Sequence, residues 1–335
     1  MARSDAEGGQ PRPIIGRSLA IAAVAVGGTA LGIASNRTGF AEQSVSVMRA
    51  LWVVPGLVAL HLGQLLLAGV AWRCLFAGSG PGAAIFYRLR IIREGIDSLL
   101  PVAQIGGEIV GARLLSQYGI APSRAGASVI VDVTIEFLTQ VAFLLAGLCT
   151  LAWLSHGAAG WGIWLGALLV GVGATAALLL AQRFGLLRAV EALMRGIARR
   201  WPVLAGTSLD GLHAAALGFY RRPTALAGCI LLHLLAWGLG SIETWAVLNV
   251  LGVPATPLQA FTVESLGMAA RSAGFAIPAA LGAQEGGFVL AAASVGLPVG
   301  PAFALSLTKR LREILVGLIG LVLWRLVVRR PALQG

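Results

Sequence analysis

Residues 125–153 read AGASVIVDVTIEFLTQVAFLLAGLCTLAW, an apolar run long enough to cross a bilayer as one helix. The run carries two charged residues, Asp132 and Glu136, and with Ser128 and Gln140 they recur at every fourth position. All four therefore lie on one face of the helix. Carboxylates inside a membrane are costly and usually face a protein interior or a pathway. The stripe predicts a polar interior; the alternative is hydrogen bonding between helices.

The whole chain has the composition of a polytopic membrane protein. Of its 335 residues, 57% are hydrophobic and only 12% are charged, about half the charged fraction of a soluble protein. This composition excludes a disordered chain and disfavours a soluble enzyme. The net charge of +11 would suggest nucleic acid in a soluble protein, but here it indicates basic cytoplasmic loops. No nucleic-acid partner is expected.

Six segments are apolar and long enough to span the bilayer as helices. They are about 18–36, 50–76, 125–153, 159–182, 224–250 and 302–326. Two weaker stretches, 84–118 and 258–297, are interrupted by charges, prolines and glycines. We therefore predict an all-α polytopic membrane protein with six full spans and two broken, re-entrant helical hairpins. The first apolar run is longer than a signal-peptide core, which favours a retained span over cleavage.

Arginine positions predict the orientation, because cytoplasmic loops are rich in basic residues. The tails 1–17 and 327–335, the end of the second span and the segment 183–222 hold most arginines. The connections 154–158 and 251–257 have none. We predict cytoplasmic N- and C-termini, with 183–222 as the main cytoplasmic loop. This loop is either a helix on the membrane surface or a solvated linker.

The two hairpins resemble each other. The segment LLPVAQIGGEIVGARLLSQYGI from Leu99 aligns with AIPAALGAQEGGFVLAAASVGL from Ala276 at an offset of 177. The offset pairs these scarce residues: Pro101 with Pro278, Glu108 with Glu285, Asp132 with Lys309, and Glu136 with Glu313. In the predicted orientation 18–153 and 159–326 then form an inverted repeat, as in many transporters. The alternative is coincidence in an apolar chain of biased composition.

The breaks in the hairpins predict hinges. Backbone groups freed by proline or glycine are tolerated in a membrane only against protein or a water-filled cavity. The candidate hinge residues are Pro101, Gly106, Gly107, Pro278 and Gly282. We predict that the first hairpin enters from the cytoplasmic side and the second from the opposite side.

The last apolar segment contains Lys309, Arg310, Arg312 and Glu313 within five residues. Each charge costs about 2.5–3.5 kcal/mol at a helix centre, while a leucine or valine returns only about 0.3–0.6 kcal/mol. This turn must therefore line a polar interior, pair internally or lie near the interface. Arg310 and Glu313 have the spacing of an i,i+3 ion pair.

The hairpins carry charges of their own. Arg90 with Glu94, and Arg93 with Asp97, have i,i+4 spacing and could form ion pairs on one helix surface. Arg113 and Arg271 add positive charge at the hairpins. Guanidinium groups bind anionic headgroups through two parallel hydrogen bonds, which is the functional alternative to self-satisfied surface pairs.

The sequence contains no pattern typical of a metal site or a cofactor site. Cys74, Cys149 and Cys229 lie far apart in apolar stretches, and the four histidines form no HxxxH or HExxH motif. We therefore expect no disulfide framework, metal or cofactor. No catalytic motif is found either, so no enzymatic activity is expected.

The segments EGIDSLLPVAQIGGEIVGARLLSQYGIAPSRAGASVIVDVTIE and ESLGMAARSAGFAIPAALGAQEGGFVLAAASVGLP, with ALSLTKRLREILVGLIGLVLW, resemble the lysylphosphatidylglycerol synthase transmembrane (flippase-like) superfamily. The second segment is most similar to the hopanoid-biosynthesis-associated (HpnL) subgroup. The resemblance covers nearly the whole chain and implies a bacterial inner-membrane protein that moves lipids between leaflets. Full-length synthases add a soluble aminoacyltransferase domain after their membrane part. No such segment follows the last span, so lysyl transfer is not expected.

The residues and the resemblance together predict a lipid-translocating or lipid-binding protein whose partner is an anionic or hopanoid lipid. Four arginines would hold the headgroup and acidic residues would pair with them in the empty site. The candidate ligand-binding residues are Arg93, Glu94, Asp97, Glu108, Arg113, Asp132, Glu136, Arg271, Glu285, Lys309, Arg310 and Glu313. Two alternatives remain open: an intramembrane lipid-modifying transferase, and a non-transporting assembly factor of a lipid-synthesis complex.

Overall fold

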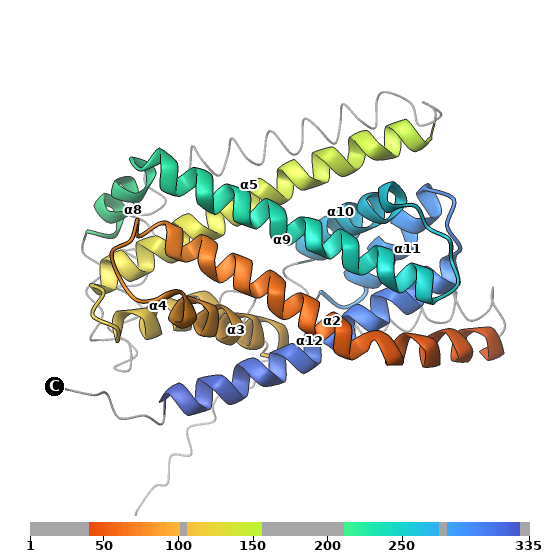
Figure 1. The fold of residues 1–335 in the computed structure, drawn as a ribbon, viewed down its shortest axis with the longest axis horizontal. Helices are drawn as coiled ribbons and strands as arrows, with labels where there is room; N and C mark the ends of the chain where they lie inside the picture. Colours follow the sequence, from red (N-terminus) through yellow and green to blue (C-terminus); the bar gives the residue numbers. More distant parts are fainter. Residues whose placement is uncertain (1–39, 101–105, 156–210, 275–279, 329–335) are drawn as a thin grey trace, which may run out of the picture.

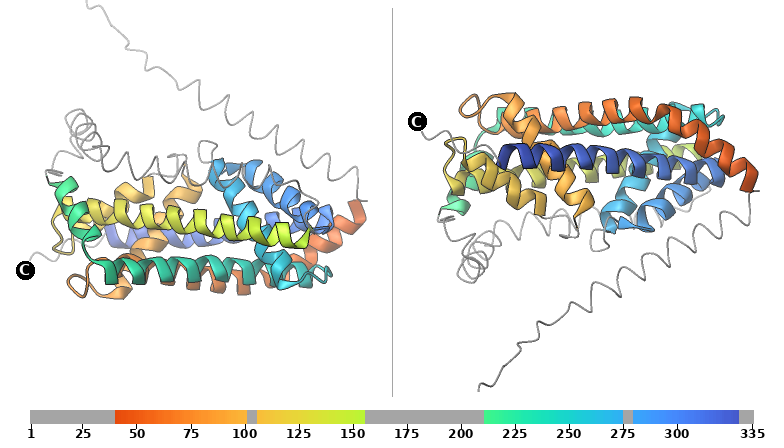
Figure 2. Two further views of the ribbon diagram at one scale, coloured as in Figure 1. Left: turned by 90° about the horizontal axis from the view of Figure 1, so that it is seen from above. Right: turned by 90° about the horizontal axis from the view of Figure 1, so that it is seen from below.

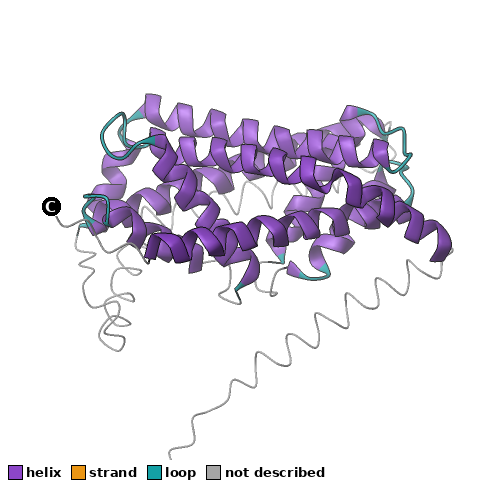
Figure 3. Ribbon diagram, turned by 60° about the horizontal axis from the view of Figure 1, so that its bottom comes forward, coloured by secondary structure: helices purple, strands orange, loops and turns teal. Residues whose placement is uncertain are grey.

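A computed structural model describes residues 40–100, 106–155, 211–274 and 280–328, with side chains from residue 52 onward. In these ranges the fold is built from helices alone (Figure 1 and Figure 3). They are α2 (Phe40–Cys74), α3 (Ala83–Leu99), α4 (Gly106–Ser116), α5 (Pro122–Leu154), α8 (Leu212–Tyr220), α9 (Pro223–Val250), α10 (Pro257–Ala273), α11 (Ala283–Ser294) and α12 (Val299–Val328). The predicted all-α class is confirmed for this part of the chain.

Three of the described helices are long and apolar enough to cross a membrane: Trp52–Cys74 within α2, α5 and α9. They correspond to the predicted spans 50–76, 125–153 and 224–250. Helix α12 covers the predicted span 302–326, but the charges between Lys309 and Glu313 make it less apolar. The predicted spans 18–36 and 159–182, and residues 183–210 of the predicted loop, lie outside the described residues.

Each predicted hairpin consists of two helices that pack against each other, α3 with α4 and α10 with α11. Pro101 and Pro278 lie in the connections, outside the described residues. Gly106 and Gly107 begin α4, and Gly282 precedes α11 with a φ of +82°, which glycine adopts without steric cost. The two hairpins lie at opposite ends of the long axis in Figure 1.

The long helices run in opposite directions along this axis. Helices α2 and α9 pack along each other and are antiparallel, and α5 and α12 also run oppositely (Figure 1 and Figure 2). Helix α3 packs on α12, and α10 packs on α5. Each hairpin therefore rests against the last long helix of the other half of the chain, so the middle of the molecule is built from both halves.

Glycines bring α3 and α12 into backbone contact. A Cβ atom on Gly95 would lie 2.6 Å from the carbonyl oxygen of Gly317 and 2.9 Å from the Cα atom of Gly320. Small residues allow such close approach of helices inside a membrane. This contact places the charged residues of α3 and α12 around one interior.

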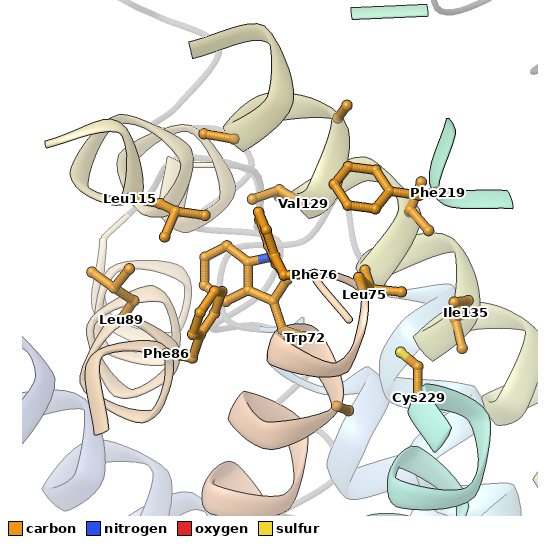
Figure 4. Close-up of a cluster of buried hydrophobic side chains, with 14 of the residues drawn as sticks. Trp72, Leu75, Phe76, Phe86, Leu89, Leu115, Val129, Ile135, Phe219 and Cys229 are labelled. Carbon is orange, nitrogen blue, oxygen red and sulfur yellow. The ribbon is translucent and has the colours of Figure 1, made fainter. Parts of the chain in front are cut away.

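Apolar side chains pack at both ends of the bundle. At one end, Trp72 lies edge-on to Phe86 with ring centroids 5.0 Å apart, and Phe76 lies against Phe219 at 5.4 Å (Figure 4). At the other end Phe288 is buried in a cluster with residues of α9, α10 and α12. The outer surface is also apolar, with Leu290 72% exposed, as expected for a lipid-facing exterior. Charged residues occupy the region between the two clusters.

Candidate functional site

Asp132 on α5 is the centre of one group of buried ion pairs. Nη1 of Arg93 donates to its Oδ2 atom at 3.0 Å, and Nη1 of Arg90 lies 3.9 Å from the same oxygen. Nε2 of His233 lies 3.2 Å from Oδ1. The Asp132 side chain is fully buried, so two arginines of α3 and a histidine of α9 surround one carboxylate that has no access to water.

The same two arginines have further carboxylate partners. Arg93 forms an ion pair with Glu108 of α4, and Arg90 with Glu136 of α5. Both arginines thus pair across helices, which corrects the i,i+4 pairing within α3 that their spacing predicts. The physical reason is that α4 and α5 bring carboxylates within 4.0 Å of both guanidinium groups, whereas Asp97 accepts a hydrogen bond from Gly107 and Glu94 faces His61.

Small and aromatic residues shape the space around Arg93. A Cβ atom on Gly111 would lie 2.8 Å from Cδ of Arg93, so the glycine lets the side chain pass along α4. The guanidinium carbon lies 5.0 Å from the centroid of the Trp72 ring, a cation–π distance. Trp72 in turn donates from Nε1 to Ser128 at 3.0 Å. The polar stripe of α5 therefore begins where the apolar cluster ends.

The rest of that stripe also faces other helices. Gln140 donates from Nε2 to Oγ of Ser272 at 2.5 Å and to the carbonyl oxygen of Met268 at 3.3 Å. The predicted common face of Ser128, Asp132, Glu136 and Gln140 is thus an interior face, since each residue contacts another helix.

Lys309 on α12 is the centre of a second group of buried ion pairs, in which acids surround a base. Its Nζ atom lies 2.9 Å from Oε2 of Glu264 and 3.6 Å from Oε1 of Glu243. Thr244 donates to the same Glu264 carboxylate. A Cβ atom on Gly240 would lie 2.7 Å from Oε1 of Glu264, so this glycine makes room for the acid. Lys309 is 1% exposed, and two acids from α9 and α10 compensate it.

Asp132 and Lys309 are the residues that the sequence offset pairs. One is a buried acid held by bases, and the other is a buried base held by acids. The two positions that the offset pairs therefore both hold a buried charge, of opposite sign. Each of these two buried charges is compensated by opposite charges from neighbouring helices, as burial in a low-dielectric interior requires.

The remaining charges of α12 join this second group. Arg312 pairs with Glu243 and approaches Glu313 at 3.5 Å. Arg310 donates to Oε1 of Glu285 on α11 at 2.8 Å, and Nη1 lies 3.5 Å from Glu313. The predicted i,i+3 pair of Arg310 and Glu313 is confirmed. The turn pairs with α9, α10 and α11 as well as internally, which explains how four charges are tolerated.

Arg271 on α10 is the most exposed cation among the ion pairs that the structure describes inside the bundle. Its side chain is 22% exposed, compared with 14% for Arg310 and 1% for Arg93. Its Nη1 atom lies 3.7 Å from Oε1 of Glu313, and Gln284 donates to the same oxygen at 3.3 Å. The Arg271 pair is therefore long and partly open to solvent.

Glu94 and Asp97 are the acidic residues of α3. Nε2 of His61 approaches Glu94 at 3.8 Å. Asp97 accepts a hydrogen bond from the Gly107 N–H at 2.8 Å. A Cβ atom at position 107 would collide with the Asp97 carboxylate and with the carbonyl oxygen of Arg93. Gly107 therefore fixes how closely α4 folds back on α3.

Two neighbouring cavities open among these residues, and the larger one is mainly polar. One has a volume of about 170 Å³ and the other about 100 Å³. Both are lined by Arg90, Glu94, Glu136 and Arg271. A water molecule occupies about 30 Å³ in the liquid, so each cavity has room for a few waters or for part of a headgroup.

The sequence-predicted residues are not all brought together. Arg113 lies exposed in the last turn of α4 and lines neither cavity. Glu285 accepts from the Gly282 N–H at 2.7 Å and so also caps α11. The other candidates belong to the ion-pair groups, the Glu94–His61 pair or the Asp97 hydrogen bond described above.

Sequence reasoning missed several members of the network: His61, His233, Glu243, Glu264 and the cross-helix roles of Arg90 and Arg312. Glu243 could have been recognised from the sequence, because it is the single charged residue of the apolar α9. An intramembrane carboxylate indicates function by default. The histidines had none, since neither belongs to a recognisable motif.

Asp132, Cys229 and His233 are all buried, and their potential ligand atoms lie within 4.8 Å of one another. Cysteine, histidine and aspartate are donors that zinc accepts. However, the Asp132 carboxylate also binds Arg93 and lies near Arg90, and two guanidinium groups oppose a further cation. The arrangement therefore fits an ion-paired carboxylate better than a metal centre.

Comparison with known proteins places this network in a family. The model of a family described as the lysylphosphatidylglycerol synthase TM region matches residues 19–320, which include both hairpins and both ion-pair groups. Searches among curated proteins and among solved structures found no match. The match and the long apolar helices show a multi-pass membrane protein. The chain belongs to the lysylphosphatidylglycerol synthase TM region family.

Proposed function

We propose that the protein binds the headgroup of an anionic membrane lipid in its central cavities and moves the lipid between leaflets. The observation that carries the proposal is the position of Arg271, which lines both cavities and, among the described residues, is held by one long ion pair. A phosphate can accept two parallel hydrogen bonds from one guanidinium group. It would thus bind Arg271 better than Glu313 does at 3.7 Å.

The architecture that we propose is an inverted repeat of 18–153 and 159–326 with six full spans. In support, α3 and α10 each have 17 residues, and α4 and α11 have 11 and 12. The packing partners correspond in the same way. Helix α3 packs on α12 as α10 packs on α5, and α4 packs on α5 as α11 packs on α12. Repeats of this kind place a transport site at their interface.

Movement of either hairpin would break ion pairs that cross the interface. Arg93 links α3 to Asp132 of α5, and Glu264 links α10 to Lys309 of α12. A headgroup charge would offset the loss by taking the place of one partner, because a ligand shifts a conformational equilibrium only through its differential affinity. In this proposal the lipid carries its own charge through the bundle while its acyl chains remain outside, and no chemical step is assigned.

Arg271→Gln tests the proposal in liposomes that contain the full chain and fluorescent phosphatidylglycerol. A hydrogen bond to a charged group contributes about 1.5–3 kcal/mol, so we expect leaflet exchange to fall about 10- to 100-fold. Arg113→Gln, an exposed arginine outside the cavities, is the matched control and should exchange at the wild-type rate. Unchanged exchange of every anionic, zwitterionic and hopanoid probe in Arg271→Gln would contradict the proposal.

We also propose a bacterial inner-membrane location with both termini cytoplasmic and a link to hopanoid or other lipid biosynthesis. The support is the arginine distribution along the chain. Reporter fusions after Ser155 and after Pro257 should report outside, and a fusion near Arg199 should report inside. The reverse pattern would reject this orientation, and mixed signals from the first two positions would reject the inverted repeat.

A further inference from the structure

Glu94 differs from its acidic neighbours in the kind of cation that it faces. Asp132, Glu136, Glu264 and Glu313 each have an arginine or lysine nitrogen within 4.0 Å. In the described part of the chain, the ion-pair partner of Glu94 is His61, with Nε2 at 3.8 Å. Histidine changes its charge between about pH 5 and 8, whereas arginine stays charged. The nearest cation of this carboxylate therefore depends on a bound proton.

The surroundings of His61 leave one ring nitrogen for that proton. Nδ1 lies 2.6 Å from Oε1 of Gln64, a carbonyl oxygen that accepts a hydrogen bond from the ring. The neutral imidazole then carries its hydrogen on Nδ1, and Nε2 keeps the free lone pair. Within the described residues Nε2 is buried and has no hydrogen-bond partner, and it is the atom that approaches Glu94. Protonation at Nε2 therefore creates a charge directly beside the carboxylate.

Other charged groups face the pair from every helix that packs around it. They are Arg90 and Asp97 of α3, Glu108 of α4, Glu136 of α5, His233 and Glu243 of α9, Glu264 and Arg271 of α10, and Arg312 and Glu313 of α12. Nine of these ten have close partners of their own: Arg90 with Glu136, Arg312 with Glu243, Glu264 with Lys309, His233 with Asp132, Glu108 with Arg93, Asp97 with the Gly107 N–H, and Glu313 with Arg310 and Arg312. Arg271, whose one ion pair within the described residues is long, is the member that can respond to a change at Glu94.

We propose that His61 and Glu94 form a proton-binding site that controls whether Arg271 is available to an anionic headgroup. When Nε2 is protonated, the imidazolium compensates Glu94, and Arg271 remains free to bind the anion. When the proton leaves, Glu94 loses its nearest cation, and it attracts the guanidinium group of Arg271, which lines the same two cavities, more strongly. Acid pH therefore favours lipid binding, and proton uptake and lipid uptake are linked. The link to lipid rests on the proposed function; the proton site does not.

The proton site is tested without any lipid ligand. The full chain, labelled with ¹³C in its histidine rings, is placed in phosphatidylcholine nanodiscs and titrated by NMR. We expect the resonance that is missing from His61→Gln to respond to pH in the wild type. In Glu94→Gln this response should change, because the carboxylate beside Nε2 is absent. A His61 signal that does not respond to pH, or whose response is the same in Glu94→Gln, would overturn the proposal.

The coupling is tested by binding of fluorescent phosphatidylglycerol at pH 5.5 and pH 8. Allosteric couplings are typically 5- to 150-fold, and we expect about tenfold tighter binding at the lower pH in the wild type. The two variants should differ in direction: His61→Gln binds weakly at both pH values, and Glu94→Gln binds tightly at both. A purely structural role of the pair would weaken both variants alike.

His213→Gln, on α8 and away from the cavities, is the matched histidine control and should keep the tenfold dependence. A tenfold dependence that survives in His61→Gln would reject the coupling while leaving the proposed function intact. Absence of phosphatidylglycerol binding at either pH would reject the proposed function and the coupling together, and the NMR titration would still decide the proton site.

Discussion

Replacement of Asp132 by asparagine is expected to lower the free energy of unfolding by about 3–5 kcal/mol, the usual cost of removing one partner from a buried ion pair. The loss leaves Arg93 and Arg90 with one carboxylate fewer and His233 without its acid. None of these groups reaches water easily, since the side chains of Arg93 and His233 are 1% and 2% exposed. Denaturant unfolding of the purified protein in detergent micelles measures the change.

Glu136→Gln is the graded control for this prediction. It removes the same charge from the same stripe, but its side chain is 24% exposed and it has one arginine partner. Solvent that reaches this partly exposed carboxylate screens its charge, which lowers the contribution of the pair below that of a fully buried one. We therefore expect a much smaller loss. Equal effects of the two substitutions would show that burial does not set the energetics of this network.

Lys309→Met should be similarly destabilising, by about 3–5 kcal/mol, because it removes the buried cation that lies between the carboxylates of Glu264 and Glu243. Methionine fills the same volume and adapts to irregular space, so the cost is electrostatic and not a cavity. Thermal and denaturant unfolding in micelles both measure it.

The double variant Lys309→Met with Glu264→Gln isolates the electrostatic part. Removing both members of a buried pair is often close to neutral, whereas removing one is costly. Glutamine keeps an oxygen that can accept the hydrogen bond from Thr244. The double variant should therefore recover most of the stability lost in Lys309→Met. If it is less stable than the single variant, the loss arises from packing and this explanation is wrong.

Much of the framework could be predicted because scarce residues stand out in an apolar chain. The breaks that predict hairpins at 84–118 and 258–297 correspond to the helix pairs α3–α4 and α10–α11. The Asp132 stripe was identifiable from i+4 spacing, and the charged turn at Lys309–Glu313 from its insertion cost. In each case a local rule was sufficient, either helical periodicity or the free-energy cost of placing a charge in lipid.

Partner choice could not be predicted in the same way. Arg93 has Asp97 one turn away on its own helix, but its closest carboxylates are on α4 and α5. Glu94 pairs with a histidine 33 positions earlier in the chain, and Lys309 with acids of α9 and α10. These choices depend on which helices become neighbours, and sequence separation carries no information about that.

The sequence by itself determined that this is a helical membrane chain, where its long apolar helices and broken hairpins lie, and which helix faces carry buried charge. Only the tertiary structure decided how those charges combine: Asp132 among bases, Lys309 among acids, and Glu94 beside a histidine. The reason is that the desolvation cost of a charge is a local property, which can be read from the sequence of one helix. Its compensation is a property of distance in space, set where α3 meets α5 and α12 and where α10 meets α9.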